Sequence, residues 1–502
     1  AKMLHQLMGN IDVVVTDVVA GSTLYRARQR GAYRERLVAH LEAQAAEGAD
    51  VAAELDYLRG PGASSKAAKR SIRHSHRYQG AGDYREVSLP RDAAVLRDAG
   101  YFVKYAIGAY GWALELYTNV VNGDLCGVPA TVTGSCCTRR GAMGDNCFGT
   151  NFASYLRVTG LKREDVAYAS FANVDNHIIP FVVAKDHAAR AVVVACRGSL
   201  SAEDILIDVT ATSAPVAALR GEFELPPAVT SASMAHSGIL TVAATIAREL
   251  QGQGVLSALL GAGGACEGYE LVVTGHSLGA GAAATLGLLL KAAFPPLRAI
   301  CFSPPGGLVD EALAESMDDY CTSVVVGEDL IPRLSVPAVF RLRDGVIECL
   351  THAKANKAHI YGTAFQPYPA VEELMYDPNE EGFEAAEATA RLFFEEVNMI
   401  DAARTLGVEG DSFMPGRVLH YAVVEVERER CALPGCDKHR VYKPFWATRR
   451  DFQDIVMSHR MMLDHMPDYC AKVVTEYAAS LDAGYQESVG SDTELTRGAQ
   501  GV

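Results

Sequence analysis

From about residue 166 onwards, short continuous apolar runs alternate with stretches of helical composition. The apolar runs are bounded by turn residues, so they predict buried strands over residues 165–171, 178–184, 191–196, 271–274, 297–302 and 322–326. Helices are predicted over residues 234–250 and directly after residue 277. Strands separated by helices indicate an α/β fold with a mostly parallel central sheet, in which functional groups gather at the carboxyl ends of the strands.

The pattern also divides the chain into regions. Residues 1–90 predict a polar, helical extension and linker, with one helix over 33–58, and residues 91–480 predict the main domain, opened by an amphipathic helix over 94–120. Residues 481–502 are small and polar and predict a flexible tail. Residues 360–410 interrupt the alternation; their helical spacing favours an ordinary packed helix over a cap or regulatory insert. The apolar positions at this spacing are Phe383, Ala386, Ala390, Phe393, Val397 and Ile400.

Composition and charge narrow the classes of function. The 502 residues are 49% hydrophobic, which allows a sizeable core, and the net charge of −15 argues against nucleic acid as a general partner. A basic run over residues 66–77 predicts a solvated linker or, less simply, a contact with a membrane surface. No apolar stretch is long enough to span a bilayer, but the first residue is Ala1, so we allow for a fragment that lacks an N-terminal anchor.

The cysteines are scattered and indicate a reducing compartment. Two groups of potential ligands lack the paired C-x2-C spacing of zinc sites, so we predict no metal centre. They are Cys126, Cys136, Cys137 and Cys147, and Cys431, Cys436 and His439.

The strongest chemical signal lies in Leu271–Leu290, which reads LVVTGHSLGAGAAATLGLLL. An apolar strand, the pattern G-x-S-x-G and a small-residue helix together predict a nucleophile elbow with Ser277 at its apex. Gly275 and Gly279 leave room for the neighbouring strand and helix, and the start of the helix favours a developing oxyanion. The alternative is a glycine-rich turn that only packs closely.

A catalytic serine needs a base, and the base needs an orienting carboxylate. In folds of this class the chain order is serine, acid, histidine. The run CTSVVVGEDLIP places Asp329 after a predicted strand, so Asp329 is the preferred acid, while Glu328 and Asp310 remain open.

The base must follow the acid along the chain. His420 is preferred because it lies in PGRVLHYAVVEV, where Pro415 and Gly416 open a strand, and His465 in MMLDHMPD is second. The remaining downstream candidates are His352, His359, His439 and His459.

An acyl oxyanion needs two backbone N–H donors. Leu278, the residue after the nucleophile, is expected to supply one. Ser199 is expected to supply the other, because AVVVACRGSLS predicts a buried strand that ends in a tight turn at Gly198.

With these residues in place, the chain resembles the class 3 lipases, and more closely the sn-1-specific diacylglycerol lipases. The blocks that carry the resemblance are VVVACRGSLSAEDILIDVT, MAHSGIL, VVTGHSLGAGAA, CFSPPGG, VVVGEDLIPRLSVP, FMPGRVLH and DFQDIVMSHRMMLDHMPD. The similarity covers residues 90–475 and, more weakly, residues 12–30. GHSLG is shared by many lipases, whereas GEDLIPRLS and HMPD are more selective.

The resemblance implies an α/β-hydrolase that cleaves the sn-1 ester of diacylglycerol to a 2-monoacylglycerol and a fatty acid. It assigns Ser277, Asp329 and His420 to the triad and Ser199 and Leu278 to the oxyanion hole. It implies no cofactor for the chemistry, calcium stimulation in some members, and a membrane-associated protein whose catalytic domain faces the cytoplasm. The alternatives are a phospholipase A1, a triacylglycerol lipase, or a lipase-like scaffold without activity.

Overall fold

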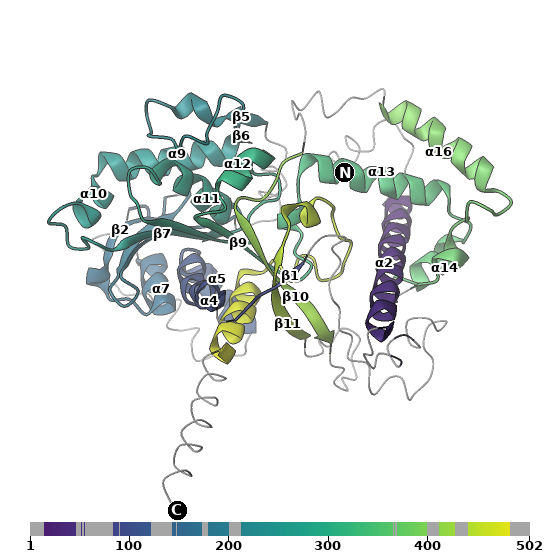
Figure 1. Ribbon diagram of the computed structural model, residues 1–502, viewed down its shortest axis with the longest axis horizontal. Helices are drawn as coiled ribbons and strands as arrows, with labels where there is room; N and C mark the ends of the chain where they lie inside the picture. Colours follow the sequence, from purple (N-terminus) through teal and green to yellow (C-terminus); the bar gives the residue numbers. More distant parts are fainter. Residues whose placement is uncertain are drawn as a thin grey trace, which may run out of the picture.

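A central sheet organises the computed structural model, which describes residues 15–46, 52, 55, 84–89, 91–121, 143–146, 148–172, 179–199, 212–364, 366, 369–398, 411–426 and 440–481. The sheet has nine strands in the order β1-β11-β10-β9-β8-β7-β4-β3-β2 (Figure 1). The strands are β1 (Arg85–Glu86), β2 (Val166–Ser170), β3 (Phe181–Asp186), β4 (Ala191–Cys196), β7 (Glu270–His276), β8 (Leu297–Phe302), β9 (Cys321–Val326), β10 (Arg417–Val426) and β11 (Arg440–Ala447).

The middle of the sheet is parallel and its edges are antiparallel. Strands β4, β7, β8, β9 and β10 run in the same direction, whereas β2, β3, β11 and β1 are joined by antiparallel pairing. The central strands are apolar without alternation because both faces of the sheet are covered. The predicted mostly parallel sheet flanked by helices is therefore confirmed.

Two layers of helices cover the sheet (Figure 1). The core on one face contains side chains of α9 and α11, and the core on the other contains side chains of α4, α7 and a helix over residues 467–481. The helices of these layers are α4 (Ala93–Gly108), α5 (Trp112–Val121), α7 (Thr150–Thr159), α9 (Ser237–Gly252), α10 (Val255–Leu260), α11 (Leu278–Leu290) and α12 (Glu311–Ser316).

Two helices are shorter than the residue ranges that the apolar pattern predicted. The helix expected over 94–120 is divided into α4 and α5, because the chain turns at Gly111, whose φ is +76°. The helix expected over 234–250 begins only at Ser237, since Met234–His236 form strand β6, which pairs with β5 (Ser213–Pro215). Periodicity alone did not show either boundary.

The N-terminal helix α2 (Val15–Ala46) begins well before the predicted start at residue 33. It packs against α13 (Val336–Thr351), α14 (Lys357–Gly362) and α15 (Val371–Leu374), and their shared apolar cluster includes Leu24, Val346 and Leu374. The approach to α13 is close: a Cβ on Gly21 would lie 2.7 Å from Leu350 Cγ. Figure 1 shows α2 beside this group of helices, to one side of the sheet.

The predicted helix of the 360–410 region is α16 (Phe383–Asn398). Ala386 and Ala390 on it are buried, and Glu387 lies 3.3 Å from the His352 ring nitrogen at the end of α13. In the described part of this region, α16 is therefore a helix packed on α13, and it follows α15 and the end of α14. Residues 399–410 lie outside the described residues, as do the basic run and both cysteine groups.

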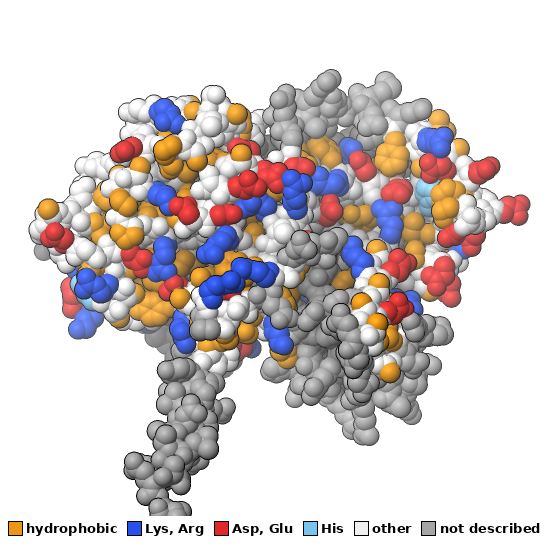
Figure 2. All heavy atoms as spheres, in the orientation of Figure 1, with side chains coloured by type: hydrophobic (Ala, Val, Ile, Leu, Met, Phe, Trp, Pro, Cys, Tyr) orange, Lys and Arg blue, Asp and Glu red, His pale blue; other side chains and the backbone are white. Residues whose placement is uncertain are grey.

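Charge is mixed over the visible surface. On the face shown in Figure 2, acidic and basic side chains are interspersed both around the central sheet and over the helices beside it. Within the described part of the chain, no helix combines the length and the hydropathy needed to cross a bilayer.

Candidate active site

Ser277 occupies a sharp turn between strand and helix, as its sequence predicts. Strand β7 ends at His276, helix α11 begins at Leu278, and Ser277 between them has φ 59° and ψ −129°. A non-glycine residue with positive φ is strained, so the surrounding packing must hold the turn. A Cβ on Gly275 would lie 2.8 Å from the Cys196 carbonyl oxygen, which explains why this position is a glycine.

Ser277, His465 and Asp329 form one connected line of hydrogen-bonding groups. The Ser277 Oγ lies 3.0 Å from His465 Nε2, and His465 Nδ1 lies 2.9 Å from Asp329 Oδ1. Asp329 follows strand β9, and His465 lies in the turn that precedes the 467–481 helix. All three side chains are buried, with exposed fractions of 1% for Ser277, 5% for His465 and 0% for Asp329.

The partners determine where the protons lie. A carboxylate can only accept, so Nδ1 of His465 donates to Asp329 and Nε2 is left as the acceptor for the Ser277 hydroxyl. The backbone N–H of Ile331 also donates to Asp329 Oδ1 at 2.9 Å, which fixes the carboxylate. The geometry is that of a serine activated by an oriented imidazole.

His420 does not take part in this arrangement, which corrects the preferred base. It lies on β10 opposite Val325, and its Nε2 donates to the Gly327 carbonyl oxygen at 2.9 Å. Its Nδ1 lies 3.1 Å from the Tyr84 hydroxyl, so both ring nitrogens have other partners. Burial, together with the Arg333 charge, lowers the pKa of His420 to about 3, so the ring is a neutral part of the core.

The position of His420 on the strand explains the error. Its neighbours Leu419 and Tyr421 face the core beneath the sheet, so His420 points to the opposite face, where it packs on Phe452 at 5.2 Å between rings. His465 reaches Ser277 because the turn before the last helix returns to the end of β9. Its signal in the sequence was the selective block HMPD, which contains no strand pattern.

The other carboxylates considered as the acid have structural partners. Asp310 caps α12 by accepting the Leu313 N–H at 2.9 Å. Glu328 pairs with Arg30 and contacts Ser458, although it adjoins Asp329. Among the candidates, Asp329 is thus the one that reaches a histidine beside Ser277.

The loop after β4 lies against the elbow. A Cβ on Gly279 would collide with the Cys196 carbonyl oxygen and lie 2.6 Å from the Arg197 carbonyl carbon, so the two segments are in direct contact. Ser199 follows this contact, and its buried hydroxyl has no hydrogen-bond partner among the described residues. A buried hydroxyl without a partner, on the loop that contacts the elbow, fits a group held for the reacting substrate.

This contact yields a first prediction. Gly279→Ala is expected to lower turnover by at least about tenfold and stability by about 1–3 kcal/mol, because the added methyl group pushes the β4 loop away from the elbow. Gly281→Ala is the matched control on the same helix, since its Cβ would meet only the side chains of Ile239 at 3.1 Å and Pro305 at 3.2 Å. Ester hydrolysis and thermal unfolding of both variants measure the effect. Equal activity in the two would contradict the role of this contact.

The His276 ring packs beside the ring of His465. The two ring centres lie 4.8 Å apart, and Nδ1 of His276 lies 2.9 Å from the Tyr110 hydroxyl. Burial lowers the pKa of His276 well below its usual value, and the neighbouring His465 lowers it further. His276 therefore stays neutral and adds no fixed positive charge beside the base.

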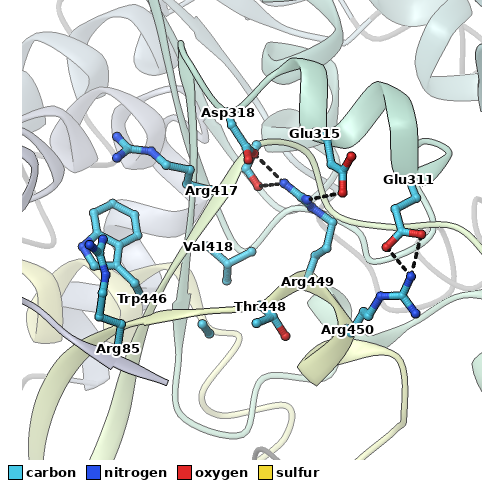
Figure 3. Close-up of a pocket in the computed structure, with 12 residues that line it drawn as sticks. Arg85, Glu311, Glu315, Asp318, Arg417, Val418, Trp446, Thr448, Arg449 and Arg450 are labelled. Atoms are coloured by element: carbon cyan, nitrogen blue, oxygen red, sulfur yellow. Dashed lines mark hydrogen bonds and ion pairs between the residues drawn. The ribbon is translucent and has the colours of Figure 1, made fainter. Parts of the chain in front are cut away.

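A separate hollow of about 370 Å³ lies at the opposite end of the parallel strands (Figure 3). It is lined by Arg417, the first residue of β10, whereas Asp329 follows the other end of β9. Two of its arginines are engaged in ion pairs, Arg449 with Asp318 and Arg450 with Glu311. This hollow is distant from Ser277 along the sheet and contributes nothing to the triad.

Comparison with known proteins agrees with the predicted resemblance. Residues 193–339 match the family model described as Lipase (class 3). Mouse (Mus musculus) diacylglycerol lipase-beta is 32% identical over 407 residues, which are 78% of this chain and 57% of that protein. Human (Homo sapiens) diacylglycerol lipase-alpha is 28% identical over 481 residues, which are 93% of this chain and 42% of that protein. The chain thus spans about half the length of the curated relatives it matches.

Solved structures show a more distant likeness. The mono- and diacylglycerol lipase from Aspergillus oryzae is 21% identical, with a TM-score of 0.33, over 48% of this chain and 73% of that chain. The Rhizomucor miehei lipase propeptide complex is 17% identical, with a TM-score of 0.30, over 56% of this chain and 74% of that chain.

Proposed function

We propose that this chain, whose residues 193–339 form a class 3 lipase domain, is a serine lipase that hydrolyses an ester of diacylglycerol. The observation that carries the proposal is the line from Ser277 through His465 to Asp329, with contacts of 3.0 and 2.9 Å. Such a line activates a hydroxyl for attack on an acyl carbon. The similarity to diacylglycerol lipases supports the choice of substrate.

The first half of the reaction forms an acyl-enzyme. His465 Nε2 takes the proton from Ser277 as its Oγ attacks the ester carbonyl carbon, and Asp329 stabilises the imidazolium that results. The backbone N–H groups of Leu278 and Ser199 hold the oxyanion of the tetrahedral intermediate. His465 then gives its proton to the leaving glycerol oxygen as the ester C–O bond breaks.

Water completes the reaction by the same route. His465 removes a proton from a water molecule, whose oxygen attacks the acyl carbon, and the proton returns to the Ser277 oxygen as the fatty acid leaves. Ser277 itself exposes only 1% of its surface. No cofactor is needed in any of these steps.

Cleavage at the sn-1 position is the finer part of the proposal and rests on the resemblance. We expect a diacylglycerol labelled separately in its two acyl chains to release the sn-1 fatty acid and leave a 2-monoacylglycerol. Chromatography of the products at early times, before acyl migration, measures this. Release of the sn-2 chain at an equal or higher rate would contradict it.

Other substrates would use the same triad. Phospholipase A1 or triacylglycerol lipase activity depends on the shape of the acyl and head-group pocket, so turnover of diacylglycerol, triacylglycerol and phosphatidylcholine should be compared side by side. A scaffold without activity is disfavoured by the connected triad. Failure of a fluorophosphonate probe to label the protein would favour that scaffold.

The membrane surface is the proposed place of action, because diacylglycerol partitions into bilayers. Attachment on the cytoplasmic side and stimulation by calcium also remain proposals from the resemblance. Among the described residues, no group of three or more His, Cys, Asp or Glu side chains could hold a metal ion, and no step above uses calcium.

A further inference from the structure

Helix α2 of the N-terminal extension reaches the loops that carry the acid and the base. Its apolar face packs on α13, α14 and α15, with Gly345 of α13 so close that a Cβ there would lie 2.7 Å from Tyr25 Cδ2. One turn further along α2, Gln29 donates to the Ile455 carbonyl oxygen at 2.8 Å and accepts the Met457 N–H at 3.0 Å. Helix α2 is therefore hydrogen-bonded to the backbone of residues 455–457, which precede His465 in the chain.

Arg30, the next residue on α2, makes the contact nearest to the triad. Its Nη2 lies 2.6 Å from Glu328 Oε1, and the side chains are 15% and 9% exposed. The other carboxylate oxygen of Glu328 contacts the Ser458 hydroxyl. Burial alone would raise the pKa of Glu328, but the Arg30 charge and the Ser458 hydrogen bond bring it down to about 2. Glu328 is thus a buried anion paired with an arginine of α2, a helix far from it in the sequence.

Glu328 and Asp464 connect this contact to the catalytic groups. Each adjoins one member of the triad, Glu328 before Asp329 and Asp464 before His465. The Glu328 N–H donates to Asp464 Oδ2 at 2.8 Å, which joins the acid loop to the base turn through the backbone. The Leu330 N–H donates to the Met461 carbonyl oxygen at 3.1 Å and forms a second tie beside the first.

Where the 327–330 loop meets the 458–465 turn, the negative charges of the buried carboxylates need positive partners. Glu328, Asp329 and Asp464 are buried carboxylates on two adjoining segments, and unpaired they would repel one another at low dielectric constant. Arg460 pairs with Asp464 at 3.0 Å, while Arg30 supplies the opposing charge for Glu328. Arg440 also acts electrostatically on Glu328. Arg440, Arg26 and Glu328 act in the same way on His459.

We propose that Arg30 is a positioning residue for the triad, which makes α2 part of the catalytic unit. Neutralising Glu328 keeps the 327–330 loop and the 458–465 turn together, so that Asp329 and His465 stay aligned with Ser277. This inference rests on the proposed hydrolase activity. It requires no contact between Arg30 and the substrate, so its loss lowers kcat rather than raising KM.

The experiment is a double-mutant cycle on the full chain with p-nitrophenyl butyrate, a soluble ester. Arg30→Met is expected to lower kcat by about tenfold or more, with KM changed by less than about twofold. Glu328→Gln is expected to lower kcat by only about threefold, and in that background Arg30→Met adds less than about twofold, because no unpaired anion remains. Arg30→Lys, which keeps the charge, restores most of the kcat lost in Arg30→Met.

Arg28→Met is the matched control. Arg28 lies on the same helix and pairs with Glu348 of α13 at 2.7 Å, away from the triad. This variant should keep kcat within about twofold, because it removes an ion pair between α2 and α13 whose side chains are 34% and 47% exposed. Thermal unfolding of every variant shows whether α2 remains docked.

Three outcomes would overturn the proposal: equal kcat in Arg30→Met and Arg28→Met, additive losses in the cycle, or no rescue by lysine. If Arg30→Met does not fold, Arg30→Gln, which also removes the charge, takes its place, and a kcat equal to that of Arg28→Met overturns the proposal. Failure of the proposed function would look different, because the wild-type chain itself would then neither hydrolyse the ester nor react with a fluorophosphonate.

Discussion

Ser277→Ala is expected to lower diacylglycerol turnover by roughly four to six orders of magnitude. The loss follows from the loss of the attacking oxygen, since no other described hydroxyl is hydrogen-bonded to His465. The small residual rate would come from the oxyanion donors and from substrate binding. Fatty-acid release from mixed micelles and labelling by a fluorophosphonate measure the change, and labelling should be abolished.

The fold should survive this substitution, so the control is thermal unfolding. Only one buried oxygen is removed, and the strained turn at φ 59° stays in place. A midpoint within a few degrees of wild type is expected. Turnover within tenfold of wild type in a folded Ser277→Ala variant would exclude Ser277 as the nucleophile.

His465→Gln is expected to lower turnover by roughly four orders of magnitude or more, because the serine then has no base and Asp329 has no imidazole to orient. His420→Gln is the matched variant, with the same change at the other histidine. It should keep turnover within about tenfold, since a glutamine amide can still donate to the Gly327 carbonyl oxygen that His420 Nε2 now reaches. We expect its main effect on stability, a loss of about 1–3 kcal/mol.

The pair of variants separates the two candidate bases directly. Turnover with diacylglycerol and the unfolding midpoint should be measured on both proteins. An inactive, folded His420→Gln beside an active His465→Gln would reverse the assignment made from the geometry. Loss of activity in both, with unchanged midpoints, would contradict the purely structural role that the geometry gives His420.

Local signals in the sequence were sufficient for part of this site. The elbow at Ser277 depends on neighbouring residues only: an apolar strand before it, glycines at 275 and 279, and a small-residue helix after it. Asp329 follows the next-but-one parallel strand, so the alternation of strands and helices predicted its side of the sheet. The parallel centre of the sheet was predictable for the same reason, since fully buried strands are apolar without alternation.

The base could not be chosen from such signals. A strand motif around His420 indicated its element correctly, but the pairing of β10 with β9 decides which face the ring occupies, and a shift of one residue reverses that face. His465 lies in a turn without periodicity, and it reaches Ser277 only because residues 458–465 return to the end of β9.

The sequence by itself predicted the elbow at Ser277, the preferred acid Asp329 and the class of sheet, because each prediction depends on residues close together in the chain. Tertiary structure alone showed that His465 and not His420 lies beside Ser277. It alone also showed that α2 docks through Arg30 onto Glu328, a contact between positions 298 residues apart. Contacts of that kind depend on how separate segments pack in space, and the order of residues within each segment carries no direct record of the partner it will meet.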